Sequence, residues 1–152
     1  MIPDSQASHH IWKSEALSCF GNSSKCRIRI VDTAILIPVE RLGWVRQNDE
    51  FESSLLFGNP DTSGELYVMR YRVLVACDVP AHWHPEDEHV TVIAGELSLG
   101  LGERFSADVL RPLALGSYAL IPRRQPHFTR YAAGTIVQVH GIGPLVINYV
   151  DH

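Results

Sequence analysis

The sequence predicts a single all-β domain. Short runs rich in β-branched and aromatic residues are separated by Gly, Pro or Asn roughly every eight to twelve residues, which is typical of a β-sandwich or barrel. No window of about twelve residues carries the apolar stripe of a helix. The chain has 152 residues, 45% hydrophobic and 20% charged, a length that suits one domain and a composition that excludes wholesale disorder.

The first 26 residues carry no sustained apolar period, so we expect a mobile leader or short arm over 1–26 and one barrel domain over 27–152. The expected strands are, in order, Ile28–Val31, Ala34–Val39, Ser54–Phe57, Glu65–Val75, Glu88–Ala94, Leu97–Leu101, Tyr118–Ile121, His127–Tyr131, Thr135–His140 and Leu145–Val150. The close spacing of the two runs on either side of Gly95 predicts a hairpin there.

Charge and hydropathy exclude several classes of function. The net charge is −4, and the longest run of basic residues is Arg123-Arg124, which argues against nucleic-acid binding. The apolar stretches are too short to span a bilayer, so we expect no membrane partner. The first residues lack the basic start and apolar run of a signal peptide, and we therefore expect a cytoplasmic protein.

The stretch from His82 to Glu88 is the most informative part of the sequence. Residues two apart in a strand share a face, so His82 and His84 can point together into one interior, and Glu88 follows at even spacing. Two imidazoles and a carboxylate on one inward face suit a divalent metal ion. A pair of surface histidines on a loop would explain the His-x-His element equally well if it stood alone.

Two sequence patterns, one from His82 to Gly95 and one some thirty residues further on, match the motifs of a known family. His82, His84, Glu88 and Gly95 match the first motif of the cupin superfamily (HxH, three residues, Glu, six residues, Gly). Its second motif is matched by Gly116, Pro122 after five further residues, and His127. The chain therefore resembles a small cupin, and flanking strand patterns extend the likeness from about Glu65 to the C-terminus.

The second motif departs from the family pattern at two positions. Arg124 stands where the family usually has Gly, and Tyr131 stands where it often has Asn. Because a long side chain tolerates a positive φ poorly, Arg124 predicts a different turn geometry beside the metal. Neither change removes a metal ligand.

The resemblance implies a double-stranded β-helix (a jelly-roll barrel) that holds one divalent metal ion through His82, His84, Glu88 and His127. Two adjacent coordination positions would stay open, which favours a small oxygen-rich substrate that chelates through two oxygens. Fe(II) is the favoured metal, but Mn, Ni, Co and Zn suit the same ligands. Because small cupins often pair, the resemblance also implies a homodimer, with Ile28–Val31 or the leader added to the partner's sheet edge.

Further site residues are predicted from strand alternation. Tyr67 and Tyr71 share a parity opposite to Arg70 and Arg72, so they are expected to line the interior, Tyr67 against substrate and Tyr71 as a catalytic group. If the shared face of Gln138 and His140 on the late strand faces the interior, Gln138 is expected to contact the substrate and His140 to act as a catalytic base. Arg124 is expected at the rim of the barrel, where it would attract an acidic substrate.

Three functions fit these residues. The favoured function is an Fe(II) dioxygenase-type oxidoreductase acting on a chelating metabolite. The second is a non-redox isomerase, cyclase or lyase in which the metal polarises a carbonyl and His140, Tyr67 or Tyr71 serves as the base. The third is a metal-holding ligand sensor without catalysis. The fold alone does not choose among them.

Overall fold

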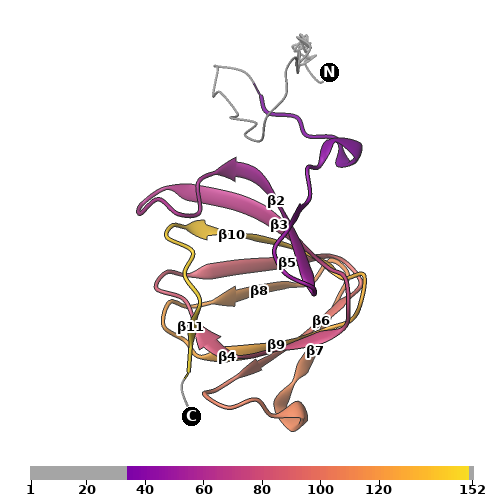
Figure 1. The fold of residues 1–152 in the computed structure, drawn as a ribbon. Helices are drawn as coiled ribbons and strands as arrows, with labels where there is room; N and C mark the ends of the chain where they lie inside the picture. The colour runs from indigo at the N-terminus through magenta and orange to yellow at the C-terminus, as the bar shows by residue number, and fades with distance from the viewer. Residues whose placement is uncertain (1–33, 151–152) are drawn as a thin grey trace, which may run out of the picture. The chain divides into compact units, whose positions relative to one another are not determined.

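Two antiparallel sheets face each other and curve into a barrel in the computed structural model, which describes residues 34–150 (Figure 1). Sheet A contains, in spatial order, β1 (Val45–Arg46), β2 (Phe51–Gly58), β3 (Leu66–Val73), β10 (Ile136–Ile142), β5 (Glu88–Ala94) and β8 (Tyr118–Ile121). Sheet B contains β11 (Asn148–Tyr149), β4 (Cys77–Trp83), β9 (His127–Tyr131), β6 (Glu96–Leu101) and β7 (Arg111–Ala114). The all-β double-stranded β-helix predicted from the sequence is confirmed.

Helical structure in residues 34–150 is limited to two short turns, η1 (Val39–Arg41) and η2 (Ala107–Val109). None of the described helices has the length and apolar character needed to cross a bilayer.

Strand alternation places the core between the two sheets. On β3, Tyr67, Met69 and Val73 are buried, whereas Arg70 and Arg72 lie on the outer face, as the sequence pattern predicts. Arg72 pairs there with Glu52. The main apolar cluster draws on both sheets and comprises Tyr67, Met69, Val90, Val92, Leu97, Ile121, Val137 and Val139.

The hairpin predicted around Gly95 is wrong, because β5 belongs to sheet A and β6 to sheet B. The chain changes sheets at this glycine, which has φ +72° and whose backbone lies so close to Thr135 that an added Cβ would stand 2.7 Å from the Thr135 Cα. Thr135 secures the corner, because its Oγ1 donates to the Glu96 carbonyl (2.9 Å) and accepts from the Glu96 N–H (3.1 Å).

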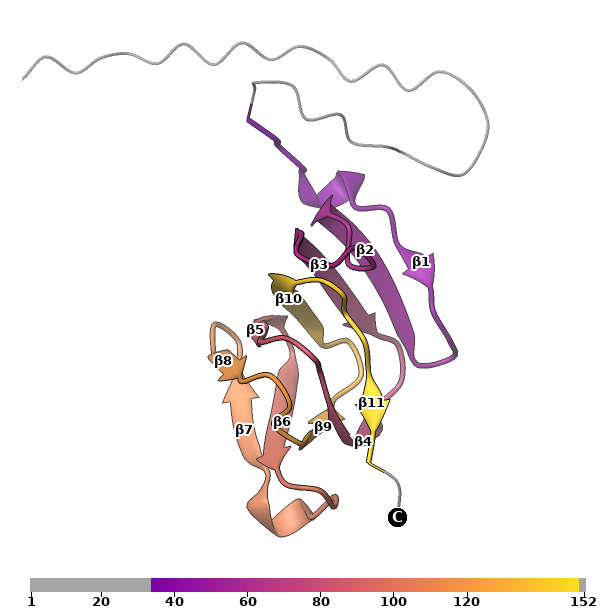
Figure 2. The same ribbon diagram turned by 90° about the vertical axis from the view of Figure 1, so that its left-hand side faces the viewer.

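Other boundaries also differ from the expectation. β1, β4 and β7 were not expected. The pattern of β4 is interrupted by Pro80, and a shift of register between Val79 and His82 accommodates that proline. The expected strand Ala34–Val39 is wrong, because residues 34–38 have no regular secondary structure and Val39 begins η1. The predicted strand Ile28–Val31 and the leader over 1–26 lie outside the described residues. Figure 2 shows β11, the only strand within the expected Leu145–Val150, beside β4.

Phe128 packs on the outer side of β9, against β6 and against the loop that follows β6. Its ring is fully buried, lies 5.1 Å from the Phe105 ring between centroids, and occupies the space that a Cβ at Gly100 would need. The neighbouring His127 points to the opposite face, so the packing of Phe128 also fixes the position of a site residue.

We expect Phe128→Ala to destabilise the protein by about 3–5 kcal/mol, because it leaves a large cavity behind β9. Leu115→Ala is the control: Leu115 is 69% exposed, and its loss should change the free energy of unfolding by less than about 0.5 kcal/mol. Urea denaturation of both variants measures the difference. Equal stability of the two would contradict the packing described here.

Candidate metal centre

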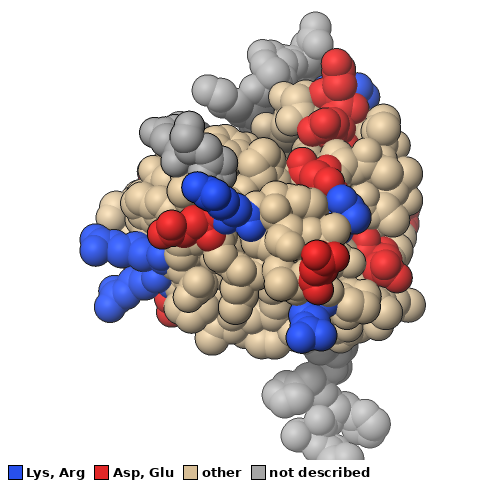
Figure 3. Space-filling model, turned by 90° about the horizontal axis from the view of Figure 1, so that it is seen from below, with Lys and Arg blue, Asp and Glu red and all other residues tan. Residues whose placement is uncertain are grey.

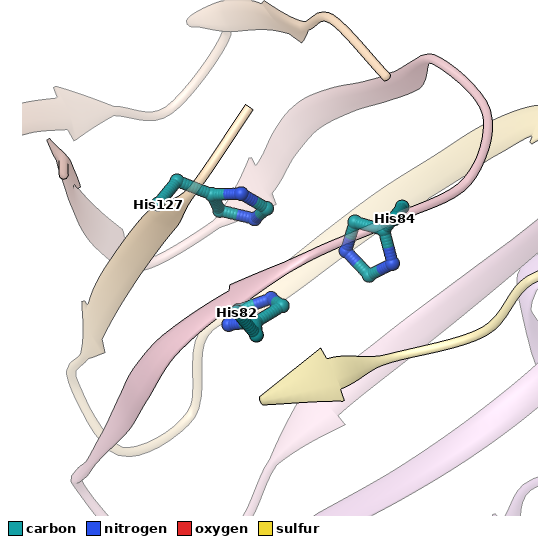
Figure 4. A group of neighbouring side chains, drawn as sticks. All are labelled: His82, His84 and His127. Carbon is teal, nitrogen blue, oxygen red and sulfur yellow. The ribbon is translucent and has the colours of Figure 1, made fainter. Parts of the chain in front are cut away.

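Three histidines from two adjacent strands of sheet B meet inside the barrel (Figure 4). His82 lies near the end of β4, His84 follows directly after its last residue Trp83, and His127 opens β9 directly opposite His82 in the strand register. Their exposed fractions are only 5%, 6% and 1%. One nitrogen from each ring lies within 4.8 Å of the other two, so a single metal ion can contact all three.

Each histidine is held by a backbone carbonyl oxygen on its far side. The three contacts to the Nδ1 atoms are Pro80 O with His82 at 2.8 Å, Val146 O with His84 at 2.8 Å and Gln125 O with His127 at 3.1 Å. A carbonyl only accepts hydrogen bonds, so each Nδ1 donates and each Nε2 keeps its lone pair for a metal. These carbonyl groups were not found from the sequence, because a backbone group leaves no residue-type signal.

Glu88 lies at the edge of this cluster. Its Oε2 is 3.6 Å from His84 Nε2 and 3.5 Å from His127 Nε2. Burial opposes ionisation of the carboxyl group, but the contact with His127 and the charges of the other histidines outweigh burial and lower the pKa of Glu88. Burial and the neighbouring His127 lower the pKa of His82 to about 4. Both groups therefore hold the protonation state that binds a metal at neutral pH.

The residues present fit a divalent metal ion. His84 Nε2 is buried and has no hydrogen-bond partner among the described residues. Leaving such an atom unsatisfied costs about 1–3 kcal/mol, and a bound cation would supply the missing partner. Three imidazoles and one carboxylate suit Fe(II), Mn(II), Ni(II), Co(II) and Zn(II) alike. The four residues predicted as ligands thus lie together, and their assignment as ligands stays a prediction.

Tyrosines extend the site into the barrel. Tyr67 is buried and Tyr71 is half-buried on the inner face of β3, as expected. Burial and the charge of Glu88 raise the pKa of Tyr71 to about 12, and the same two causes raise the pKa of Tyr67 and Tyr131. Tyr131 was not predicted as a site residue, although its even spacing from His127 on β9 places it on the same face.

Gln138 and His140 are not in the interior, so the placement on which their predicted roles depend is wrong. Val137, Val139 and Gly141 occupy the buried face of β10, which leaves these two residues on the outer face of sheet A. Gln138 accepts a hydrogen bond from Arg70 Nε (3.2 Å). The His140 ring stacks on the outward-facing His89 ring at 4.7 Å between centroids. Neither can contact a substrate at the histidines.

Arg124 keeps the glycine-type turn that its long side chain was expected to prevent. Its φ is +61°, and it is the only non-glycine residue with a positive φ in the described part of the chain. This conformation costs a side-chain-bearing residue about 1–2 kcal/mol. The turn is pinned to the site, because the Arg124 N–H donates to the His84 carbonyl at 2.8 Å. The side chain is exposed and does not enter the barrel.

Comparison with known proteins finds similarity in structure only. No family model and no curated protein matches the sequence. The polyketide cyclase RemF from Streptomyces resistomycificus has a TM-score of 0.58 at 18% identity, over 77% of this chain and 85% of that one. An RmlC-like cupin from Shewanella frigidimarina has a TM-score of 0.55 at 13% identity, over 69% and 87% of the two chains.

A third match is salicylate 1,2-dioxygenase from Pseudoaminobacter salicylatoxidans, with a TM-score of 0.52 at 12% identity, over 65% of this chain and 26% of that one. At these identities the matches establish the architecture. The chain has the cupin fold, a double-stranded β-helix, and three of its histidines cluster inside the barrel.

We expect His84→Ala and His127→Ala each to abolish stoichiometric metal binding while the β-sheet circular dichroism is retained. Either change removes one of the three nitrogens that converge on the metal position. The fold should be retained because neither histidine belongs to the main apolar cluster. His89→Ala is the matched control, because that ring lies outside the barrel and its loss should leave metal content unchanged. Elemental analysis after dialysis measures the outcome, and a full metal complement in either ligand variant would refute the site.

Proposed function

We propose that the protein is a metal-dependent enzyme acting on a small oxygen-rich metabolite that chelates through two oxygens. The single observation that supports this proposal is the set of three Nε2 atoms, each freed by a carbonyl on the opposite nitrogen, beside the Glu88 carboxylate. Residues His82, His84, Glu88 and His127 would hold the metal. A sensor would use the same residues, but the interior phenols of Tyr67 and Tyr71, which feel the charge of Glu88, favour catalysis.

A divalent metal at this position would supply Lewis acidity and, if it is iron, a centre for dioxygen chemistry. We favour an Fe(II) dioxygenase-type reaction. The histidines are almost fully buried, so the protein keeps bulk water away from them. Tyr67 and Tyr71 point into the same interior as protonated phenols, and we assign to Tyr67 a hydrogen bond that orients the substrate and to Tyr71 the donation of a proton.

Non-redox chemistry is the second candidate. RemF, the structural neighbour with a TM-score of 0.58, is described as a polyketide cyclase, and a cyclase also needs a polarised carbonyl and a proton donor. His140 no longer qualifies as the base for such a reaction, since it lies outside the barrel. Tyr67 and Tyr71 are then the remaining candidates from the sequence.

Elemental analysis of untagged protein purified without air separates these reactions. We expect near-stoichiometric iron that is lost in His82→Ala, followed by substrate-dependent oxygen uptake in a screen of hydroxy-ketones, keto acids, diketones and catechols. Zinc, nickel or manganese with turnover under anaerobic conditions would favour the Lewis-acid reaction. Metal without turnover would indicate a sensor, and the absence of a specific metal would refute the metal-dependent function.

We also propose that the protein forms a homodimer. Four large apolar side chains at the start of the described residues have no cover within 34–150 and are 36–72% exposed: Ile35, Leu36, Ile37 and Val39. A second copy would remove them from water.

Light scattering should therefore give twice the chain mass at micromolar concentration. Leu36→Lys with Val39→Lys should shift the protein toward the monomer, because burying either ammonium group in an interface is unfavourable. Leu115→Lys, at an equally exposed apolar position, should leave the dimer intact. A wild-type protein with the mass of a single chain would refute the dimer.

A further inference from the structure

Arg124 occupies a backbone position that favours glycine. Its φ of +61° is strained for any residue with a Cβ, and the turn is fixed by two backbone hydrogen bonds, Arg124 N–H to His84 O (2.8 Å) and Gln125 N–H to Pro122 O (3.0 Å). Glycine would adopt the same turn without strain. A long cationic side chain held at such a position points to a task for the guanidinium group itself.

Arg124 lines a cleft of about 530 Å³ close to His82. The cleft lies between the end of β4, the β8–β9 turn, the end of β11 and the loop after β6, and its lining residues are Trp83, Glu103, Arg124, Pro126, Tyr149 and Val150. Trp83 alternates with His82 and His84, so it points out of the barrel while they point in. Tyr149, by contrast, is the register partner of His82, and its ring lies 6.0 Å from the His82 ring between centroids. The cleft therefore lies at the end of sheet B and borders the histidine site at Tyr149.

The chemistry of the lining specifies the ligand. Arg124 makes no ion pair with any acidic residue of the described chain, so its charge is available. Trp83 and Tyr149 add two aromatic rings, the second 57% exposed. The wider face on this side carries basic and acidic side chains interspersed, with no field of one sign that would suit a polyanion (Figure 3). A single cation between aromatic rings suits one carboxylate on a flat, apolar body.

We propose that this cleft binds a small aromatic carboxylate through Arg124, with its ring against Trp83 and Tyr149. The cleft borders the metal centre at Tyr149 but contains none of the four proposed ligands, and its occupancy does not depend on the proposed reaction. Trp83 and the Arg124–His84 hydrogen bond connect it to the strand that carries two of the histidines. Occupancy of the cleft therefore restrains the same backbone that positions those rings.

The test is an NMR titration of the full-length protein with benzoate, with benzamide and inorganic phosphate as comparison probes. Benzoate should shift the Trp83 indole N–H and the Arg124 Nε–H resonances to saturation. Arg124→Gln should weaken that binding about ten- to a hundredfold, as expected for the loss of a charge-assisted hydrogen bond. Glu103→Gln should tighten it by about two- to fivefold, because it removes the one negative charge in the lining.

Two variants separate this role from a structural one. Arg124→Gly should raise the melting temperature, since it relieves the positive φ, and should still abolish benzoate binding. Arg123→Gln is the matched control, because the adjacent guanidinium does not line the cleft, and it should bind benzoate like the wild type.

Three results would overturn the proposal: benzoate shifts only histidine resonances, benzamide binds as tightly as benzoate, or Arg124→Gln binds benzoate normally. Binding of phosphate in place of benzoate would overturn the assignment of an aromatic carboxylate.

Discussion

The hydrogen bonds from three imidazole Nδ1 atoms to backbone carbonyls are the constraint on which the centre of this protein depends. An imidazole in an apolar barrel can rotate, and it can place its proton on either nitrogen. A carbonyl behind each ring removes both freedoms, because it accepts a hydrogen bond from one nitrogen only. The two carbonyls contributed by Pro80 and Gln125 come from the strand and turn that carry the histidines, so local backbone shape fixes His82 and His127.

This arrangement places polar groups inside an otherwise apolar core. The histidines and Glu88 lie near a cluster of valine, leucine and tyrosine side chains, and burial changes the proton affinity of each titratable member. The cost of burying these groups is offset only partly within the protein, as the unpartnered Nε2 of His84 shows. The folded state tolerates this unfavourable free energy because its stability comes from other contacts, the packing of Phe128 and of the two sheet faces.

Much of this structure follows from the sequence, because strand alternation and motif spacing are local. The inward face of β3 and the shared face of His82 and His84 were predictable from period-two alternation. The meeting of these two histidines with His127 was implied by the spacing of the two cupin motifs.

Features that depend on partners distant in the chain were not predictable. Gln138 and His140 do share a face, but only the pairing of β10 with β3 and β5 decides that it is the outer one. The sheet change at Gly95 depends on Thr135, some forty residues away, and Arg124 keeps its strained turn because of contacts that its own sequence does not specify.

The carbonyl that holds His84 belongs to Val146, which lies 62 positions further along the chain. The ribosome therefore makes this carbonyl 62 residues after the ring that it holds. A nascent chain can therefore form most of the barrel strands while the His84 ring is still free to turn. Only a chain completed at least to Val146 can hold all three rings in place, so the full histidine geometry exists only after translation has passed this point.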